Sequence, residues 1–260
     1  MKKYLVIGNP VKHSLSPKLH NHWIKENNIN AIYDKKKINE TDIKEIILEV
    51  KNNKINGINV TVPFKKLVIP FLDQLTPLAE EAQSVNTIFK KNNKIFGDNT
   101  DIDGFKQGLK HINYNVKDKK IFILGAGGVV PSILIALKSL EVAKITLSNR
   151  TKEKAVDLKK IFPDLEIVNW GENANFDMII NATSLGLEKD DQIKLDYSKI
   201  GSNKLFYDVI YNQNKTNFLL KGEESGNQIE NGKMMFIYQA QLAFKIWHNI
   251  LPKIDNKLLD

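Results

Sequence analysis

Hydrophobic residues in the first hundred positions follow two repeating patterns. Short apolar runs at 4–7, 31–38 and 55–62 are bounded by glycine, asparagine or proline, which predicts three strands. Between the second and third runs, apolar residues over 43–50 recur at spacings of three, four and seven, as in an amphipathic helix. This half of the chain is therefore predicted to alternate strands with helices.

Local turn signals add two elements to this half. Ser16 followed by Pro17 predicts a helix running to about residue 28, with Ser16 as its N-cap. Two apolar runs on either side of Asn92 and Asn93 predict a β-hairpin. Together these elements predict an α/β unit built on a mixed sheet.

The second half begins with a strand, a glycine-rich turn, a helix and another strand. Apolar residues at 120–124 lead into 125–128, a helix to about 140 follows, and 144–148 is the next apolar run. A unit of about 30 residues has the size of a βαβ element. Continued alternation predicts a parallel, doubly wound sheet. Further strands are expected at 178–180 and 205–210, and further helices at about 152–161, 214–225 and 232–248.

The composition limits what the protein can be. The chain has 260 residues, of which 42% are hydrophobic and none is cysteine. One or two domains are expected, and disulfides, a thiolate nucleophile and cysteine-ligated metal sites are excluded. No apolar run approaches the roughly 20 residues of a membrane span, and the run near the N-terminus is too short for a signal peptide. We therefore expect a cytoplasmic protein outside the membrane.

The chain carries a net charge of +8 and has a pI of about 9.3. A basic protein can bind nucleic acid, but the lysines are scattered and only Lys35, Lys36 and Lys37 are consecutive. This scatter favours an ordinary lysine-rich surface over a nucleic-acid interface. A positive field also suits a small anionic substrate or a phosphorylated cofactor.

The glycine-rich turn is the first candidate for chemistry. Gly125-Ala126-Gly127-Gly128 follows a predicted strand and opens a helix, so a pyrophosphate can approach the backbone N–H groups closely. The turn departs from the pattern G-x-G-x-x-G because residue 130 is valine. The alternative to a pyrophosphate site is an ordinary tight turn between strand and helix. Pro131 fits only in the first turn of the helix, because N–H groups there have no acceptor within the helix and the lack of one breaks no hydrogen bond.

The residues after the next strand favour NADP over NAD. An NAD-specific site normally offers Asp or Glu to the ribose hydroxyls here, whereas this chain has Asn149, Arg150 and Thr151. Arginine can bind a 2′-phosphate through charge-assisted hydrogen bonds and stack on the adenine. Thr151 either donates its hydroxyl there or caps the following helix. The alternative is that Arg150 is a solvated loop residue.

Polar residues also gather where the predicted strands of the first half end. Asn59 and Thr61 alternate along one strand, so they share a face, and Lys65 follows after a short loop. Asp101 stands near the start of a helix. Such a grouping predicts a ligand crevice at the carboxyl ends of the strands. The alternatives are solvent-facing alternation for the strand, and simple helix capping for Asp101 and Ser16.

The chain resembles the shikimate dehydrogenase family, and the resemblance covers essentially the whole sequence. No single stretch is decisive, but the order and spacing match throughout. The stretches are 8–17 (GNPVKHSLSP), 59–65 (NVTVPFK), 85–87 (VNT), 97–101 (GDNTD), 125–128 (GAGG), 149–151 (NRT), 181–186 (NATSLG) and 208–211 (DVIY), followed by Gly232, Met235, Gln239 and Ala240.

The resemblance implies two domains and one reaction. Residues 1–101 with 236–260 would form a mixed-sheet α/β substrate domain, residues 102–235 would form a Rossmann-like doubly wound cofactor domain, and the active site would lie in the cleft. The family is an NADP-dependent oxidoreductase that reversibly reduces 3-dehydroshikimate to shikimate, a step towards chorismate and the aromatic amino acids. A small-molecule substrate, NADP(H), no metal and a monomer or homodimer are expected.

The same resemblance implies roles for individual residues. Lys65 and Asp101 match a catalytic pair, with Lys65 as general acid in reduction and general base in oxidation. Both also belong to the expected substrate site. The other expected substrate contacts are Ser14 and Ser16 for the carboxylate, Thr61, Asn86 and Gln239 for the ring hydroxyls, and Tyr211 near substrate and nicotinamide, with Asn59 as a weaker candidate. His13 stands beside the serines, but no role is assigned to it. Expected cofactor contacts are Gly125, Ala126, Gly127, Gly128 and Val129 at the pyrophosphate, Asn149, Arg150 and Thr151 at the 2′-phosphate, and Val209 and Gly232 at the nicotinamide.

Two alternatives stay open at this point. One is a quinate/shikimate dehydrogenase with relaxed cofactor use, although Arg150 argues against NAD and Ser16 favours shikimate. The other is a non-catalytic NADP-binding protein, against which the presence of both Lys65 and Asp101 argues. The departures from the family pattern concern loop geometry and cofactor affinity rather than the catalytic pair, and they are Pro77, Gln83-Ser84 and Val129-Val130-Pro131.

Overall fold

The computed structural model describes residues 1–188, 190–213 and 215–255. The chain forms two compact units, one from Met1–Phe105 together with the segment that begins at Ile237, the other from Lys106–Phe236. Helices α4 (Asp101–His111) and α8 (Lys233–His248) each contribute residues to both units.

The domain boundaries predicted from the resemblance are residues 101 and 236. The structure divides the chain after Phe105 and after Phe236. The last five residues of the predicted substrate domain lie outside the described residues. Which unit takes the substrate and which takes the cofactor stays a prediction.

The first unit is built on a six-stranded mixed sheet in the order β2-β1-β3-β5-β6-β4. The pairs β2–β1, β1–β3 and β4–β6 are parallel, and β3–β5 and β5–β6 are antiparallel, which confirms the mixed sheet. The predicted hairpin is β5–β6, whose turn residues Asn92 and Asn93 have φ of 49° and 60°, a region that asparagine tolerates. The strands are β1 (Lys2–Gly8), β2 (Ala31–Lys37), β3 (Gly57–Val60), β4 (Gln74–Leu75), β5 (Thr87–Lys91) and β6 (Lys94–Asp98).

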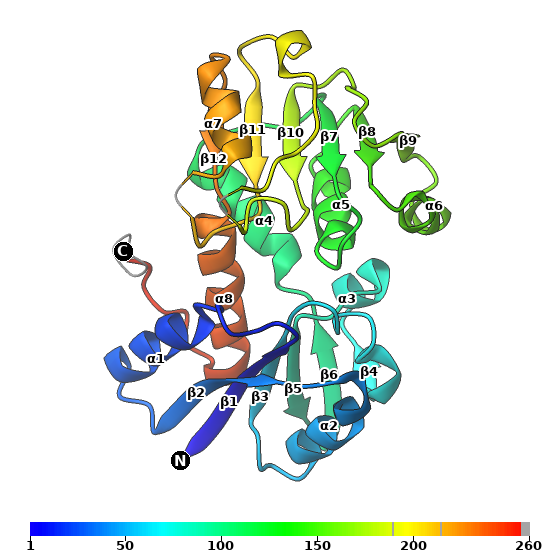
Figure 1. Ribbon diagram of the computed structural model, residues 1–260. Helices are drawn as coiled ribbons and strands as arrows, with labels where there is room; N and C mark the ends of the chain where they lie inside the picture. The colour runs from blue at the N-terminus through cyan, green and yellow to red at the C-terminus, as the bar shows by residue number, and fades with distance from the viewer. Residues whose placement is uncertain (189, 214, 256–260) are drawn as a thin grey trace. The chain divides into compact units, whose positions relative to one another are not determined.

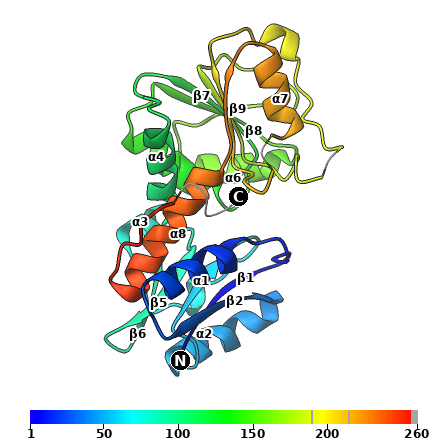
Figure 2. The ribbon, with the colours of Figure 1, turned by 90° about the vertical axis from the view of Figure 1, so that its left-hand side faces the viewer.

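Helices cover both faces of this sheet. In Figure 2, α1 (Ser16–Glu26) lies on one face and α2 (Ile43–Lys51) on the other. The four apolar positions predicted for the second helix are buried, and burying each contributes roughly 1.5–3 kcal/mol to the folded state. The short helix α3 (Pro77–Ala82) was not predicted. Short 3₁₀ segments occur at Glu40–Asp42, Ile69–Phe71 and Tyr197–Lys199.

Two predictions for the first unit are wrong in detail. The sequence predicts a strand over 55–62, but β3 ends at Val60 because the chain turns there. The N–H of Phe64 donates to the carbonyl of Thr61 (3.0 Å), and the proline between them offers no N–H to a ladder. Ser16 is not the N-cap of α1. Leu15 occupies that position without a side-chain capping bond, and Ser16 is the first helical residue.

A histidine is buried among the aromatic side chains of α1, α8 and the sheet. His20 is 1% exposed and stacks on Tyr33 with ring centroids 4.2 Å apart. Trp23 lies edge-on to it at 5.7 Å, and Phe244 of α8 is 6.1 Å away. Neither ring nitrogen has a hydrogen-bond partner within the described part of the chain. Burial, with a smaller effect from His248, lowers the pKa of His20 to about 3.

This pKa predicts how stability depends on pH. The ordinary pKa of histidine is 6.5, so below that pH the unfolded chain binds a proton that the folded protein resists. The contribution of His20 is therefore fully present above pH 6.5 and falls by about 1.4 kcal/mol per pH unit below it, down to about pH 3. His20→Phe should remove this slope from the free energy of unfolding measured between about pH 7 and pH 5. His22→Phe, at an exposed position of the same helix, should keep the slope. An unaltered slope in His20→Phe would contradict the prediction.

The second unit is built on six parallel strands in the order β12-β11-β10-β7-β8-β9. Figure 1 shows β11, β10, β7 and β8 side by side. The predicted doubly wound sheet is confirmed. The order reverses between β7 and β10, and ligands of such sheets bind at the carboxyl ends of the strands beside this switch point. The strands are β7 (Lys120–Leu124), β8 (Lys144–Ser148), β9 (Glu166–Val168), β10 (Met178–Asn181), β11 (Leu205–Asp208) and β12 (Gln228–Glu230).

The helices of the second unit follow the predicted alternation. They are α5 (Val130–Ser139), α6 (Lys152–Ile161) and α7 (Asn217–Glu224), besides the parts of α4 and α8 in this unit. Pro131 lies in the first turn of α5, as the sequence requires. Within the described residues, no helix is long and apolar enough to cross a membrane.

Candidate active site

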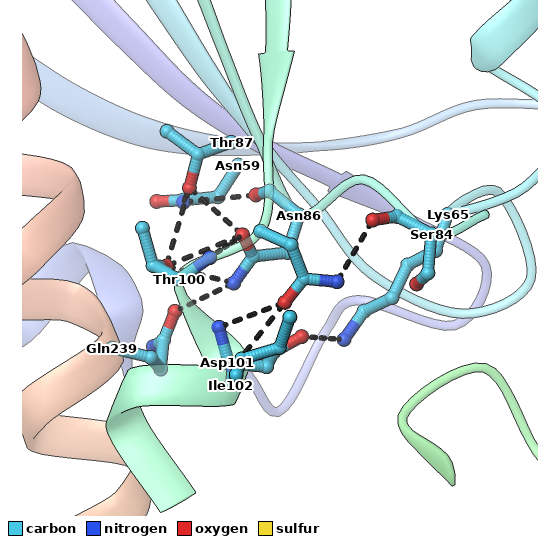
Figure 3. A network of polar contacts seen from close by, with 10 residues as sticks. Asn59, Lys65, Ser84, Asn86, Thr87, Thr100, Asp101, Ile102 and Gln239 are labelled. Atoms are coloured by element: carbon cyan, nitrogen blue, oxygen red, sulfur yellow. Dashed lines mark hydrogen bonds and ion pairs between the residues drawn. The ribbon is translucent and has the colours of Figure 1, made fainter. Parts of the chain in front are cut away.

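A lysine and an aspartate form a buried ion pair in the first unit. The Nζ of Lys65 lies 2.6 Å from the Oδ2 of Asp101, although 36 positions separate the two residues in sequence (Figure 3). Lys65 is 8% exposed and Asp101 6%. The carbonyl of Lys65 accepts a hydrogen bond from the N–H of Val85 (2.8 Å), which attaches the loop after β3 to the segment that precedes β5. The ammonium is thus held in a fixed direction and largely out of water.

Asn99 explains why the carboxylate of Asp101 is available to the lysine. Asp101 and Ile102 begin α4, and both of their N–H groups donate to the Oδ1 of Asn99, at 3.1 and 3.3 Å. The Nδ2 of Asn99 donates to the carbonyl of Ser84 (2.8 Å). Since Asn99 does the capping, the interpretation of Asp101 as merely a cap is wrong. Asn99 was not predicted, although asparagine just before a helix is a standard capping signal.

A network of amides and hydroxyls lies beside the ion pair (Figure 3). The Nδ2 of Asn86 donates to the Oγ1 of Thr100 (2.9 Å) and to the Oε1 of Gln239 (3.3 Å). The Oδ1 of Asn86 accepts from the backbone N–H of Thr100 (2.8 Å). Asn86, just before β5, and Gln239, on α8, are both predicted substrate contacts, and the structure brings them together. Thr100 joins them and was not predicted.

Asn59 supports this network from the neighbouring strand. The hydroxyl of Tyr33 donates to its Oδ1 (2.7 Å), and its Nδ2 donates to the carbonyl of Asn86 (3.0 Å) and to the Oγ1 of Thr87 (3.1 Å). Asn59 is 7% exposed, so the alternative of a solvent-facing strand residue is wrong for it. Both ends of its amide are bonded to the protein, which makes Asn59 a support for Asn86.

The two serines and Thr61 follow the ends of β1 and β3, which are neighbours in the sheet. The hydroxyl of Ser14 donates to the Oγ of Ser16 (3.2 Å), and the N–H of Ser16 donates to the Oγ of Ser14 (3.3 Å). Thr61 packs so closely on Gly8 that a Cβ there would lie 2.5 Å from its Cγ2. The glycine thereby lets the loop that carries the serines run against Thr61.

The glycine turn of the second unit follows β7 at the switch point of the sheet. Gly125 has φ of +109°, and a Cβ there would lie 2.7 Å from the carbonyl oxygen of Ala182. Gly127 and Gly128 are exposed, and a Cβ at Gly127 would meet only that same oxygen, at 3.7 Å. The turn thus presents open backbone at the N-terminal end of α5, which fits a pyrophosphate.

The bulkier residues after the turn do not obstruct it. Val130 is fully buried and is the first residue of α5, so its side chain fills the core of the unit. Val129 occupies the N-cap position and is half-buried. The departure from the family pattern here is therefore mainly a change in core packing.

The residues after β8 leave an arginine exposed. The Nδ2 of Asn149 donates to the carbonyl of Thr151 (2.7 Å), which closes a tight turn around Arg150. Thr151 occupies the N-cap of α6, but its hydroxyl makes no capping hydrogen bond. Arg150 is exposed, and no hydrogen bond or ion pair of its side chain occurs within the described chain. Arg150 is also the single arginine of the sequence, a signal that the prediction did not use.

Val209, Gly232 and Tyr211 belong to one part of the second unit. A Cβ at Gly232 would clash with the carbonyl oxygen of Val209, and the N–H of Gly232 donates to the carbonyl of Ile210 (3.0 Å). The ring of Tyr211 stacks on Phe236, with centroids 4.2 Å apart. Tyr211 belongs to this unit, whereas the other predicted substrate contacts belong to the first unit.

His13 lies in the loop that carries the two serines. His13 is exposed, and it takes no part in the hydrogen bonds that join Ser14 and Ser16. In the described ranges, no group of three or more histidine, aspartate and glutamate side chains is arranged to hold a metal ion.

Comparison with known proteins finds matches along the whole chain. The family model described as "Shikimate dehydrogenase substrate binding domain" matches residues 6–88, and that described as "Shikimate / quinate 5-dehydrogenase" matches residues 107–188. The curated protein named "Shikimate dehydrogenase (NADP(+))" from Pelagibacter ubique (strain HTCC1062) is 58% identical over 259 residues, covering 100% of this chain and 98% of that protein.

Solved structures agree with these matches. The crystal structure of shikimate dehydrogenase from Aquifex aeolicus has a TM-score of 0.91 and 39% identity, covering 100% of this chain and 96% of that one. The shikimate 5-dehydrogenase of Thermus thermophilus, in complex with NADP(H) and shikimate, has a TM-score of 0.89 and 28% identity, covering 97% of this chain and 95% of that one.

Proposed function

The chain belongs to the shikimate dehydrogenase family, and on that premise we propose that it catalyses the reversible reduction of 3-dehydroshikimate to shikimate with NADPH. It is an NADP-dependent oxidoreductase. The observation that carries the proposal is the buried pair of Lys65 and Asp101 beside the Asn86–Gln239 network. On this proposal the proton donor and the groups for the ring hydroxyls belong to one unit.

Reduction of a ketone requires a hydride at carbon and a proton at oxygen. When bound, NADPH supplies the hydride. Lys65 donates the proton from its Nζ to the carbonyl oxygen as negative charge develops there, and the neutral amine takes a proton back from solvent. In the reverse direction the neutral amine accepts the proton of the substrate hydroxyl. Asp101, 2.6 Å from the Nζ, orients the amine for both steps.

The carboxylate of the substrate would be bound by hydroxyl groups rather than by a basic side chain. The hydroxyls of Ser14 and Ser16 donate hydrogen bonds to the carboxylate, for which the Ser14 hydroxyl turns away from Ser16. Thr61, Asn86 and Gln239 bind the ring hydroxyls, and Tyr211, which belongs to the other unit, is a further proposed contact of the substrate. Buried polar groups that lack a partner are costly, so such a site rejects analogues without the matching hydroxyls by large factors.

The cofactor would be bound by the second unit. The turn 125–128, with Val129, holds the pyrophosphate. Gly125 contributes its backbone shape and not a donor, since its N–H donates to the carbonyl of Ser148 (2.8 Å). Arg150, with Asn149 and Thr151, binds the 2′-phosphate. Val209 and Gly232 border the nicotinamide, where the absence of a side chain at Gly232 brings two backbone segments together.

Two alternatives remain as outcomes of the test. A quinate/shikimate dehydrogenase is favoured by the description of the second family model, which includes quinate. A non-catalytic NADP-binding protein is disfavoured by the buried Lys65–Asp101 pair, because a sensor has no need of a proton donor. We further propose that the protein acts in the cytoplasm, as a monomer or homodimer.

The decisive experiment is the absorbance of NADPH after addition of 3-dehydroshikimate. We expect rapid loss of the NADPH band, and the reverse change with NADP+ and shikimate. Kinetics with shikimate and quinate, each with NADP+ and NAD+, separate the two dehydrogenases. No oxidation of NADPH by folded protein that binds NADPH would support the non-catalytic alternative.

A further inference from the structure

Asp208 is a buried carboxylate in the second unit to which the proposed reaction assigns no task. It is the last residue of β11 and is 0% exposed. Its Oδ2 accepts from the hydroxyl of Thr216 (2.6 Å), and its Oδ1 accepts from the N–H of Ile210 (3.0 Å) and from the Nδ2 of Asn181 (3.0 Å). One carboxylate therefore ties together the ends of β10 and β11 and the residue that precedes α7.

Asn181 links Asp208 to the strand that precedes the glycine turn. In the parallel register it pairs with Asp208 on one side and with Leu124, the residue before the turn, on the other. Its Oδ1 accepts from the N–H (3.0 Å) and hydroxyl (2.7 Å) of Thr183, so its Nδ2 must face acceptors. Those acceptors are Asp208 and the carbonyl of Leu185 (3.0 Å). The orientation of this one amide thus shapes the loop over 182–185.

That loop forms one wall of the glycine turn. The carbonyl oxygen of Ala182 and the Cγ2 of Thr183 would lie 2.7 and 3.0 Å from a Cβ at Gly125. Gly186, which directly follows this loop, packs closely against the segment after β11. A Cβ at Gly186 would lie 3.1 Å from Ile210 and 3.1 Å from Thr216. Asn181, a partner of Asp208, therefore holds the loop that borders the glycine turn, and Ile210, another partner, follows Val209 in sequence.

The charge state of Asp208 suits this task. Burial raises its pKa to about 6, against the opposing effect of its three hydrogen bonds. Near neutral pH the group is therefore mainly ionised and can accept from all three donors. An amide in its place has one acceptor oxygen, which can serve the N–H of Ile210 and the Nδ2 of Asn181. Its NH2 group would then face the hydroxyl of Thr216, which would have to turn from donor to acceptor.

We propose that Asp208 is a positioning residue for the dinucleotide, acting through Asn181 and Ile210 on the two loops that border the glycine turn and the nicotinamide position. This inference rests on the proposed NADP site of the second unit. It predicts that Asp208 sets the affinity for cofactor and has little influence on the substrate groups of the first unit.

The test compares Asp208→Asn with Asp196→Asn, the same isosteric change at an exposed carboxylate that accepts from Ser198 and Lys199. We expect the Kd for NADP+, measured by titration calorimetry on the full chain, to rise about ten- to a hundredfold in Asp208→Asn. The Kd should be unchanged in Asp196→Asn, and the KM for 3-dehydroshikimate at saturating NADPH should change little in both.

A purely structural role predicts a different result. It would lower the thermal unfolding midpoint of Asp208→Asn and leave the Kd of the folded protein for NADP+ as in the unmodified chain, which would overturn the inference. If Asp208→Asn does not fold, Thr216→Val decides, because it keeps the carboxylate and removes one donor, together with the cap that the same hydroxyl gives the N–H of Leu219 in α7. A Kd raised severalfold supports the inference, and an unchanged Kd overturns it. Failure of the unmodified protein to bind NADP+ would instead refute the proposed function.

Discussion

Lys65→Ala is expected to lower kcat for reduction of 3-dehydroshikimate by about 10²–10⁴-fold, the usual contribution of a positioned general acid. The Nζ of Lys65 is the proton source in the proposed mechanism and lies 2.6 Å from the carboxylate of Asp101. The Kd for NADPH should be nearly unchanged, because the glycine turn belongs to the other unit. Steady-state kinetics and an NADPH titration of the same preparation measure the two quantities.

The variant also leaves a buried carboxylate without its cation. Removing one partner of a buried pair costs about 3–5 kcal/mol of stability, so kcat must be referred to the folded fraction, determined from thermal unfolding. Lys66→Ala is the matched control, since Lys66 is the exposed neighbour in sequence. Turnover at the unmodified rate in folded Lys65→Ala would remove Lys65 from the mechanism.

The regular elements were predictable where their signals are local. The helix predicted at 152–161 is α6 with those bounds, and the Asn92–Asn93 hairpin was predictable because asparagine tolerates positive φ. β9 and β12 were missed because each has only three residues and lies at an edge of the sheet. Three residues are too few to show the alternation of apolar and polar positions that distinguishes a strand from a loop.

The site was predictable only in part from the residues themselves. The turn after β7 has a local signal, whereas the pairing of Lys65 with Asp101 has none, and the family resemblance supplied it. The sequence left open whether Asn59 faces a ligand crevice or solvent, because its partner Tyr33 is 26 positions away and lies on another strand. A polar residue can be buried when the fold supplies its hydrogen bonds, and those bonds are long-range.

Arg150→Glu is expected to weaken NADPH binding about a hundredfold or more while changing NADH binding far less. Arg150 is exposed after β8 and no side-chain hydrogen bond or ion pair holds it within the described chain, so its guanidinium is available to a 2′-phosphate. The substitution removes charge-assisted hydrogen bonds and places a carboxylate near the phosphate, and each tenfold loss corresponds to about 1.4 kcal/mol. NADH lacks that phosphate, so the ratio of the two Kd values measures the interaction directly.

The ratio must be separated from a general effect of charge. Lys138→Glu changes the net charge by the same amount at an exposed position in the last turn of α5, at the end of that helix away from the glycine turn. It should lower both affinities slightly and equally, and added salt should reduce that effect by screening. Because arginine binds phosphate with a planar pair of donors, Arg150→Lys should recover only part of the preference for NADPH. Equal losses for NADPH and NADH in Arg150→Glu would place the 2′-phosphate elsewhere.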